Sequence, residues 1–183
     1  MNEHHPLYFF HGLESSPEGF RANYLRERYP EIRVPALPKD PRERHRILLA
    51  ELTEPAVVVG SSLGGLSALM MVRDVPRRIA GMVLLAPAVG FHDATYRTPE
   101  VLALVSSLAI PPGIPTVLIA ATRDEVIPLE AIERLVARSP EAAIRDFVKV
   151  DDQHRLHSEA ALSAMLAAIE KVRAEVQDVP ASL

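Results

Sequence analysis

Short, continuous runs of apolar residues alternate along the chain with longer segments in which apolar and charged positions are mixed. The apolar runs lack the in-and-out alternation of a strand that is exposed on one face, and this indicates strands covered on both faces. The segments between the runs fit helices. The predicted strands are Leu7–Phe10, Ile32–Val34, Ala56–Val59, Met82–Ala86, Thr116–Ala120 and Phe147–Val150.

Two of the intervening segments carry clear helix signals. Thr98-Pro99-Glu100 combines a cap residue, a first-turn proline and an acidic residue, and predicts a helix that runs to about Leu108. An apolar face at helical spacing predicts a long C-terminal helix, and this face consists of Leu162, Met165, Leu166, Ile169 and Val172.

The alternation of strands and helices predicts an α/β fold. Parallel strands joined by right-handed crossovers form a three-layer α/β/α sandwich, here with a mainly parallel sheet of about six strands. Residues 1–183 are expected to form a single domain, because the chain has no repeat, no low-complexity tract and no linker. The proline-dotted Val34–Pro38 segment is expected to be a loop, and Gln177–Leu183 a loose tail.

Composition narrows the possible functions. The absence of cysteine excludes disulfides, thiolate metal sites and cysteine nucleophiles, and the net charge of −4 argues against a general nucleic-acid binder. No apolar run approaches the roughly 20 residues of a membrane span. The first residues lack a basic leader followed by an apolar core, so a cytoplasmic location is expected, with no membrane partner.

Polar residues follow several of the predicted strands. In a parallel sheet, ligands bind beyond the carboxyl ends of the strands, where these residues are expected to lie. Ser62 follows the third strand, within Gly60-Ser61-Ser62-Leu63-Gly64. Asp124 follows the fifth strand and His154 the sixth. Serine, then aspartate, then histidine is the chain order of the catalytic triad in α/β-hydrolases, and Gly-x-Ser-x-Gly between a strand and a helix is typical of their nucleophile elbow.

The chemistry of acyl transfer explains these residue types. A serine hydroxyl needs a base to take its proton, and a neutral imidazole can do so near neutral pH. A carboxylate fixes the imidazole tautomer, and backbone N–H groups stabilise the oxyanion. Leu63, directly after the serine, and Leu13, after His11-Gly12, are the predicted N–H donors. Gly60 and Gly64 are expected where strand and helix pass too closely for side chains.

Neighbouring residues offer alternatives for each role. Ser61 is next to the predicted nucleophile but does not occupy the central position of the motif, so we interpret it as a structural hydroxyl. Glu125 is the alternative acid and His157 the alternative base, although His157 is expected to start the last helix. His11 is interpreted as a brace of the oxyanion turn. A metal site at the adjacent His4 and His5 is not expected.

These motifs together resemble the YqiA-type esterases, a small branch of the α/β-hydrolase superfamily. The resemblance implies a serine esterase for small acyl esters, or thioesters, with no cofactor, and it assigns Ser62 as nucleophile, Asp124 as acid and His154 as base. Two departures bear on specificity: Arg123 and Asp151-Asp152-Gln153 stand where the family has glycines. Arg123 could bias the site toward anionic substrates. The motifs are His11–Pro17, Val34–Pro38, Val59–Gly65, Pro87–Val89, Asp124–Val126 and His154.

The expected site is open, because the span from Val89 to Pro115 has room for about one helix and no large lid. The leading hypothesis is a serine hydrolase for small carboxylic esters. A thioesterase or acyltransferase with the same triad and a non-catalytic binding protein stay as alternatives. The oligomeric state is left open. The predicted apolar walls come from Leu13, Phe91, Tyr96, Val126, Ile127 and Leu156.

Overall fold

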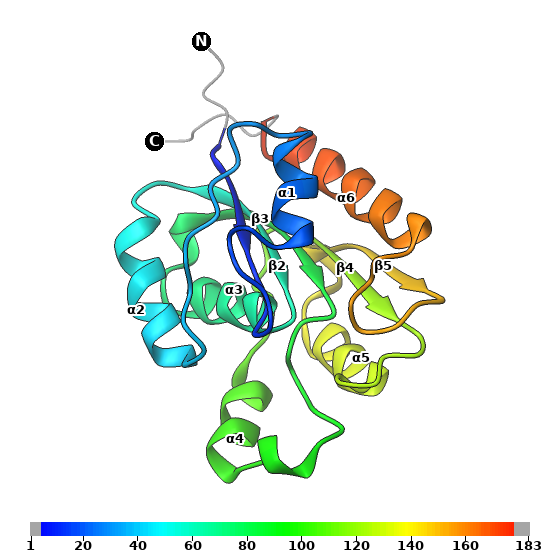
Figure 1. The fold of residues 1–183 in the computed structure, drawn as a ribbon. Helices are drawn as coiled ribbons and strands as arrows, with labels where there is room; N and C mark the ends of the chain where they lie inside the picture. Colours follow the sequence, from blue (N-terminus) through cyan, green and yellow to red (C-terminus); the bar gives the residue numbers. More distant parts are fainter. Residues whose placement is uncertain (1–4, 178–183) are drawn as a thin grey trace.

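A five-stranded sheet runs through the middle of residues 5–177, the part of the chain that the computed structural model describes (Figure 1). All neighbouring strands are parallel and lie side by side in chain order. They are β1 (Leu7–Phe10), β2 (Ala56–Ser61), β3 (Ile79–Leu85), β4 (Thr116–Ala121) and β5 (Ile144–Val150).

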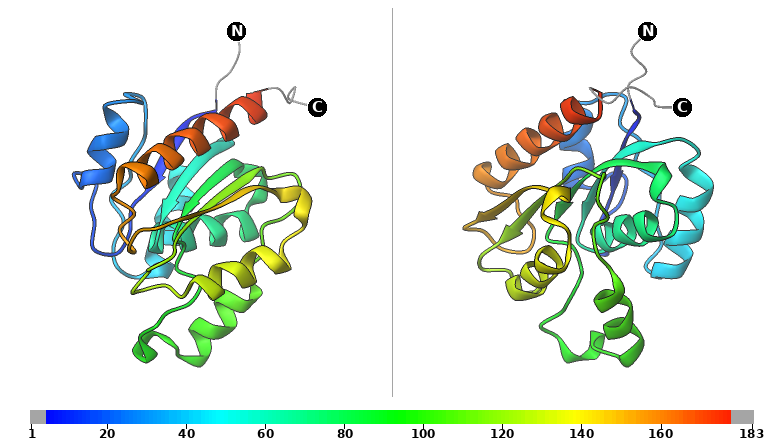
Figure 2. Two further views of the ribbon diagram at one scale, coloured as in Figure 1. Left: turned by 90° about the vertical axis from the view of Figure 1, so that its right-hand side faces the viewer. Right: turned by 180° about the vertical axis from the view of Figure 1, so that it is seen from behind.

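Helices cover both faces of the sheet and complete the predicted three-layer sandwich (Figure 2). One face packs against α1 and α6, and the opposite face packs against the other helices. Within residues 5–177 there are also three 3₁₀ turns: Pro76–Arg78 precedes β3, Ala94–Tyr96 precedes α4 and Glu141–Ala143 precedes β5. The helices are α1 (Phe20–Arg26), α2 (Pro41–Glu51), α3 (Leu63–Asp74), α4 (Pro99–Ser107), α5 (Leu129–Arg138) and α6 (Glu159–Gln177).

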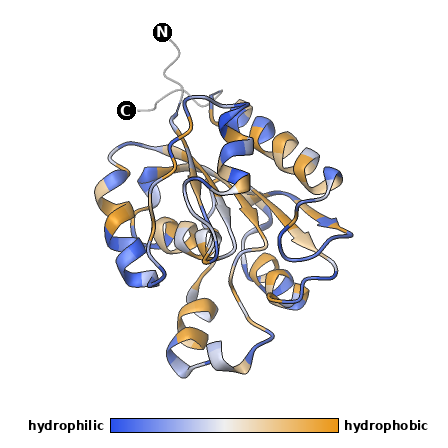
Figure 3. Ribbon diagram, viewed as in Figure 1, coloured by the Kyte–Doolittle hydropathy of each residue, from blue (hydrophilic) through white to orange (hydrophobic). Residues whose placement is uncertain are grey.

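The strands contribute to the hydrophobic core on both faces of the sheet, because alternate side chains point to opposite faces. Phe10 and Val58 pack with the α2, α3 and α5 side, whereas Phe9 and Val57 pack with the α1 and α6 side. The central strands are apolar on both faces, as the continuous runs predicted. Figure 3 shows these strands in orange and the hydrophilic segments mainly on the outer helices and loops.

The predicted second strand, Ile32–Val34, is the main correction to the fold. Only Arg33 bridges to β1: its N–H donates to Leu7 O and its carbonyl accepts from Phe9 N, both at 2.9 Å. Pro30 and Pro35 flank this stretch and have no N–H to donate, so pairing cannot extend along it. The sheet therefore has five strands and an isolated bridge, where about six strands were predicted.

The Arg33 bridge makes β1 the point where the direction of winding changes. The chain leaves β1 through α1 to Arg33 on one side of this strand, and then returns through α2 to β2 on the other side. In open α/β sheets, ligands bind beyond the carboxyl ends of the strands at such a switch point. The loops after β1 and β2 meet here.

Strand ends differ from the predictions for local reasons. Strand β3 begins at Ile79, three residues before the predicted Met82. It ends at Leu85 and not at Ala86, because Ala86 has a φ of 41° and leaves the extended conformation. Strand β5 begins at Ile144, three residues earlier than predicted. It is the edge strand, so Arg145 and Asp146 can face solvent while their backbone pairs with β4.

Both helix predictions are confirmed. The Thr98 hydroxyl accepts from Val101 N at 3.3 Å, and Pro99 opens α4. Met165, Ile169 and Val172 of α6 are buried. Gln177 belongs to α6, and the rest of the predicted tail lies outside the described residues, as does His4.

Candidate active site

Ser62 stands alone between β2 and α3, on a backbone turn that few residues adopt. Its φ of 52° and ψ of −115° are strained for a residue with a side chain. Hydrogen bonds hold it there: Ser62 N donates to Leu85 O at 2.9 Å, and Ser62 O accepts from Ala88 N at 3.0 Å and Leu66 N at 3.1 Å. The turn presents the hydroxyl above the sheet.

The flanking glycines permit this turn, as predicted. A Cβ on Gly60 would lie 2.7 Å from Gly64 O, which is too close for any side chain. A Cβ on Gly64 would overlap the carbonyl of Phe10 in β1. The start of α3 can therefore lie directly against β1 and β2 only because both positions lack side chains.

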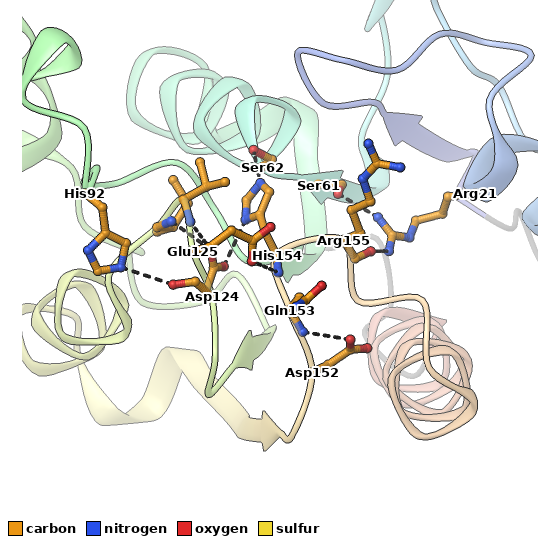
Figure 4. Close-up of polar contacts among 12 residues, drawn as sticks. Arg21, Ser61, Ser62, His92, Asp124, Glu125, Asp152, Gln153, His154 and Arg155 are labelled. Atoms are coloured by element: carbon orange, nitrogen blue, oxygen red, sulfur yellow. Dashed lines mark hydrogen bonds and ion pairs between the residues drawn. The ribbon is translucent and has the colours of Figure 1, made fainter.

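The three residues that the sequence proposed as a triad meet at this turn (Figure 4). His154 Nε2 lies 2.9 Å from Ser62 Oγ, and His154 Nδ1 lies 2.9 Å from Asp124 Oδ2. Because a carboxylate only accepts, Nδ1 carries the proton of a neutral ring and Nε2 is free to accept from the serine. The structure brings these three together from loops that are 30 and 92 residues apart.

The Asp124 carboxylate is fixed on its other side by the backbone. Its Oδ1 accepts from Val126 N at 2.9 Å and from Ile127 N at 2.8 Å, which leaves Oδ2 for the histidine. The side chain is almost fully buried. Two N–H donors therefore fix the orientation of the carboxylate that faces His154.

The alternative residues take other places. Ser61 Oγ accepts from Arg21 and not from a histidine. The Glu125 carboxylate accepts from His154 N at 3.0 Å, so it holds the backbone of the predicted base and leaves the ring to Asp124. His157 precedes α6 by two residues, and its ring lies tilted against that of Phe20 at a centroid distance of 4.5 Å.

The turn after β1 lies against the nucleophile position. A Cβ on Gly12 would lie 3.4 Å from Ser62 Cβ, so the backbone leading to Leu13 passes beside the serine. Leu63 is the first residue of α3, and its N–H belongs to the open amino end of a helix, where partial positive charge accumulates. Leu63 thus follows Ser62 directly, and the backbone that leads to Leu13 lies beside it.

Comparison with solved structures identifies the fold of the chain. Mouse alpha/beta hydrolase domain-containing protein 10 superposes with a TM-score of 0.74, at 15% identity, over 93% of this chain and 90% of that chain. A monoacylglycerol lipase from Paleococcus ferrophilus gives 0.72 at 17% identity, over 93% and 96%. The chain has the α/β-hydrolase fold. At these identities the likeness shows the fold alone.

Sequence comparison adds a partial match. The Hydrolase_4 family, described as serine aminopeptidase S33, matches residues 42–113, which include Ser62 but neither Asp124 nor His154. No curated protein matches the chain. The YqiA-type branch is not named by these comparisons, so that resemblance stays a prediction.

A buried arginine anchors the turn after β1. Arg44 of α2 is fully buried and donates to the carbonyls of His11 and Pro38 and to Ser67 Oγ. Ser67 in turn donates to Leu63 O at 3.0 Å. Burial lowers the pKa of Arg44 to about 10, so it stays charged at neutral pH.

His11 braces the same turn, as the sequence predicted. Leu37 N donates to His11 Nε2 at 3.2 Å, so Nδ1 must carry the proton that is donated to Gly12 O at 2.9 Å. Burial, opposed by the Gly12 hydrogen bond and assisted by nearby Arg44, lowers the pKa of His11. The ring is held neutral.

This lowered pKa predicts a pH-dependent stability. Below the ordinary histidine value of about 6.5, the unfolded chain binds a proton that native His11 resists, so the free energy of unfolding falls as the pH drops. His11→Gln preserves one donor and one acceptor but cannot titrate. Urea unfolding at pH 7.5, 6.5 and 5.5 should show the variant gaining on the wild type by at most about 1.4 kcal/mol per pH unit. A difference that is constant with pH would contradict a neutral His11.

The contacts of four residues at the site were not predicted from the sequence: those of Arg21, Arg44, His92 and Glu125. His92 Nε2 lies 3.1 Å from Asp124 O, and the backbone N–H of His92 donates to Val126 O at 2.9 Å, so the loop after β3 is tied to the loop of Asp124. Glu125 was identified only as a substitute acid. Its position next to Asp124 was a signal of proximity, but not of its contact with the His154 backbone.

Some of the residues predicted to line the site are exposed and others are buried in the core, and Arg123 is paired with an acidic residue. Ile127 and Leu156 are core residues, 0% and 2% exposed, so they cannot line an open site. Tyr96 and Val126 are exposed, whereas Leu13 and Phe91 are half-buried. Arg123 pairs with Asp151 at 2.6 Å on the surface, and this offsets the charge that was expected to attract anionic substrates.

Two cavities flank the site without including its polar centre. One, of about 380 Å³, lies between the loop after β1 and α2, and His11, Pro17, Leu37 and Ile47 contribute to its lining. The other, of about 660 Å³, lies between α4 and α5. Neither is lined by Ser62, Asp124 or His154.

Proposed function

We propose that this protein is a serine hydrolase that cleaves small carboxylic esters through an acyl-serine intermediate. The observation that carries the proposal is the continuous hydrogen-bonded series from Ser62 Oγ through the His154 ring to Asp124, with 2.9 Å at both links. A serine on a strained elbow, paired with an oriented neutral imidazole, is the arrangement that activates a hydroxyl for attack.

The proposed reaction has two halves. Ser62 Oγ attacks the ester carbonyl carbon while His154 Nε2 takes its proton, and the oxyanion forms beside the N–H groups of Leu13 and Leu63. His154 then returns the proton to the leaving alkoxide, which leaves an acyl-Ser62 ester. In the second half, water takes the place of the serine hydroxyl. His154 takes a proton from the water, the resulting hydroxide attacks the acyl carbon, and Ser62 recovers its proton from His154 as the carboxylic acid departs.

The described structure favours small substrates. Between β3 and β4 the chain contributes one short helix, α4, and one 3₁₀ turn. Three large apolar side chains of these segments are exposed: Tyr96 and Leu102 lie between β3 and β4, and Val126 follows β4. No helix within residues 5–177 combines the length and apolar character that a membrane crossing requires. The cytoplasmic location and the small-molecule partner expected from the sequence stay predictions.

A panel of matched substrates tests the proposed specificity. Among p-nitrophenyl acetate, butyrate, octanoate and laurate, we expect kcat/KM to be highest for acetate or butyrate and to fall for laurate, because the segment between β3 and β4 holds just one short helix and one 3₁₀ turn. Phenyl butyrate and S-phenyl thiobutyrate compare ester with thioester on one acyl group, and added alcohols reveal acyl transfer. A maximum at laurate would contradict the small-substrate proposal, and no turnover of any member would contradict an esterase.

A further inference from the structure

Arg21, the second residue of α1, buries its guanidinium between two loops of the site (Figure 4). The residue is only 7% exposed. Its Nη1 donates to Ser61 Oγ at 2.8 Å, and its Nη2 donates to Leu156 O at 2.9 Å and to Arg155 O. One planar group thus joins the end of β2 to the loop between β5 and α6.

Two of the three partners of Arg21 are immediate chain neighbours of the proposed reacting residues. Ser61 precedes Ser62, and Arg155 follows His154. The side chain therefore reaches both ends of the Ser62–His154 contact without touching either residue's reactive atom. A rigid fork of donors suits this task, because it fixes direction as well as distance.

The loop between β5 and α6, which carries His154 and is here called the histidine loop, contains a strained residue. Leu156 has a φ of 49°, a left-handed conformation that is unfavourable for a branched apolar residue. Glu125 and the Asp152 carboxylate hold N–H groups of this loop, those of His154, Gln153 and Ser158. Arg21 holds its carbonyls on the other side.

Stability alone does not account for a charge at this position. Within residues 5–177, Arg21 forms no ion pair, and its Nε is buried with no protein partner. Burial lowers its pKa to about 10, opposed by the charge of Asp152, so the guanidinium still carries its charge at neutral pH. Burying a charge without a carboxylate is unfavourable, and such violations concentrate at functional sites.

We propose that Arg21 is a positioning residue that sets the separation of Ser62 Oγ and His154 Nε2 by tying the elbow to the histidine loop. The inference rests on the proposed function, since it concerns the rate of the step in which His154 takes the Ser62 proton. A displacement of about 1 Å at a reacting contact can lower a rate by about 10²-fold.

Arg21→Met and Arg21→Lys test this role against wild-type protein. We expect kcat for p-nitrophenyl butyrate to fall by about 10²-fold in Arg21→Met, with KM little changed because Arg21 is buried. Arg21→Lys should recover only part of the rate, since a point charge cannot serve three acceptors in a plane. Arg28→Met, which removes a guanidinium that stacks on Tyr24, is the matched control and should keep the wild-type kcat.

Chemical rescue separates positioning from a general loss of structure. In Arg21→Ala, added guanidinium ion, at concentrations far below those that unfold proteins, should raise kcat in a saturable manner, and it should not do so in Ser62→Ala. Ser61→Ala removes only the elbow partner. We expect it to lower kcat by about 10-fold and to be non-additive with Arg21→Met, because both break one link.

The outcomes distinguish the two proposals. If wild-type protein hydrolyses the ester and Ser62→Ala does not, the proposed function stands whatever Arg21 does. A folded Arg21→Met with kcat within about two-fold of wild type would overturn the positioning role, as would a folded, slow Arg21→Ala that guanidinium cannot rescue. If the Arg21 variants do not fold, Ser61→Ala decides, and a wild-type kcat in that variant overturns the proposal.

Discussion

Ser62→Ala is expected to lower kcat for p-nitrophenyl butyrate by about 10⁴- to 10⁶-fold, the range found when a triad nucleophile is removed. The alanine methyl group cannot donate a proton to His154 Nε2 or form an acyl intermediate. Stability should hardly change, because the hydroxyl is half-exposed and the backbone bonds of the elbow remain. Initial rates, corrected for the buffer reaction, measure the effect.

Ser106→Ala provides the matched control for this experiment. Ser106 lies on the exposed side of α4, and its hydroxyl donates only to the helix backbone at Ala103 O. The control should keep the wild-type kcat. Residual activity in Ser62→Ala above about one hundredth of wild type would contradict Ser62 as the nucleophile.

Asp124→Asn is expected to lower kcat by about 10⁴-fold while leaving the fold intact. The two backbone donors, Val126 N and Ile127 N, will hold the amide oxygen at the Oδ1 position. The amide nitrogen then faces His154 Nδ1 and donates to it. That contact forces the ring proton onto Nε2, so the ring can no longer accept from Ser62.

Glu125→Gln distinguishes the two acidic neighbours. A glutamine oxygen can still accept from His154 N, so this variant should keep kcat within a few-fold of wild type. The pH dependence of kcat/KM, measured for both variants, shows whether either loss comes from altered protonation. If Glu125→Gln were as slow as Asp124→Asn, the assignment of Asp124 as the partner of the base would be wrong.

The sequence predicted which three residues meet at the candidate site, because strand ends determine where these residues lie. Each of Ser62, Asp124 and His154 follows an apolar run that forms a central or edge strand, and parallel strands bring their carboxyl ends to one rim. The elbow glycines are also a local signal. They are required by the crossing of β2 and α3, two elements that are adjacent in the chain.

The residues that hold the site were beyond such local signals. Arg44 shares the inner face of α2 with Leu48, and charged side chains at helical spacing ordinarily mark a solvated face. Arg21 acts across 134 residues, on carbonyls whose direction depends on the left-handed Leu156. Backbone acceptors have no signature in a sequence, so partners of this kind emerge only from the folded geometry.

The absence of a strand at Ile32–Val34 also depends on which backbone groups can pair. Ile32 and Val34 are good strand formers, yet the neighbouring prolines limit pairing to Arg33. The edge strand β5 was predicted too short, because its polar residues are untypical of a buried strand although its backbone pairs with β4 from Ile144 onward. Local composition identified the buried strands, although β3 begins three residues before the predicted Met82, and it described the margins of the sheet less well.

The most direct test of a covalent serine mechanism is intact-mass analysis of the protein after reaction with a fluorophosphonate, followed by peptide mapping. We predict one adduct per chain, located on Ser62, absent from Ser62→Ala and slowed in Asp124→Asn. An adduct on any other residue, or no reaction with folded wild-type protein, would contradict the account.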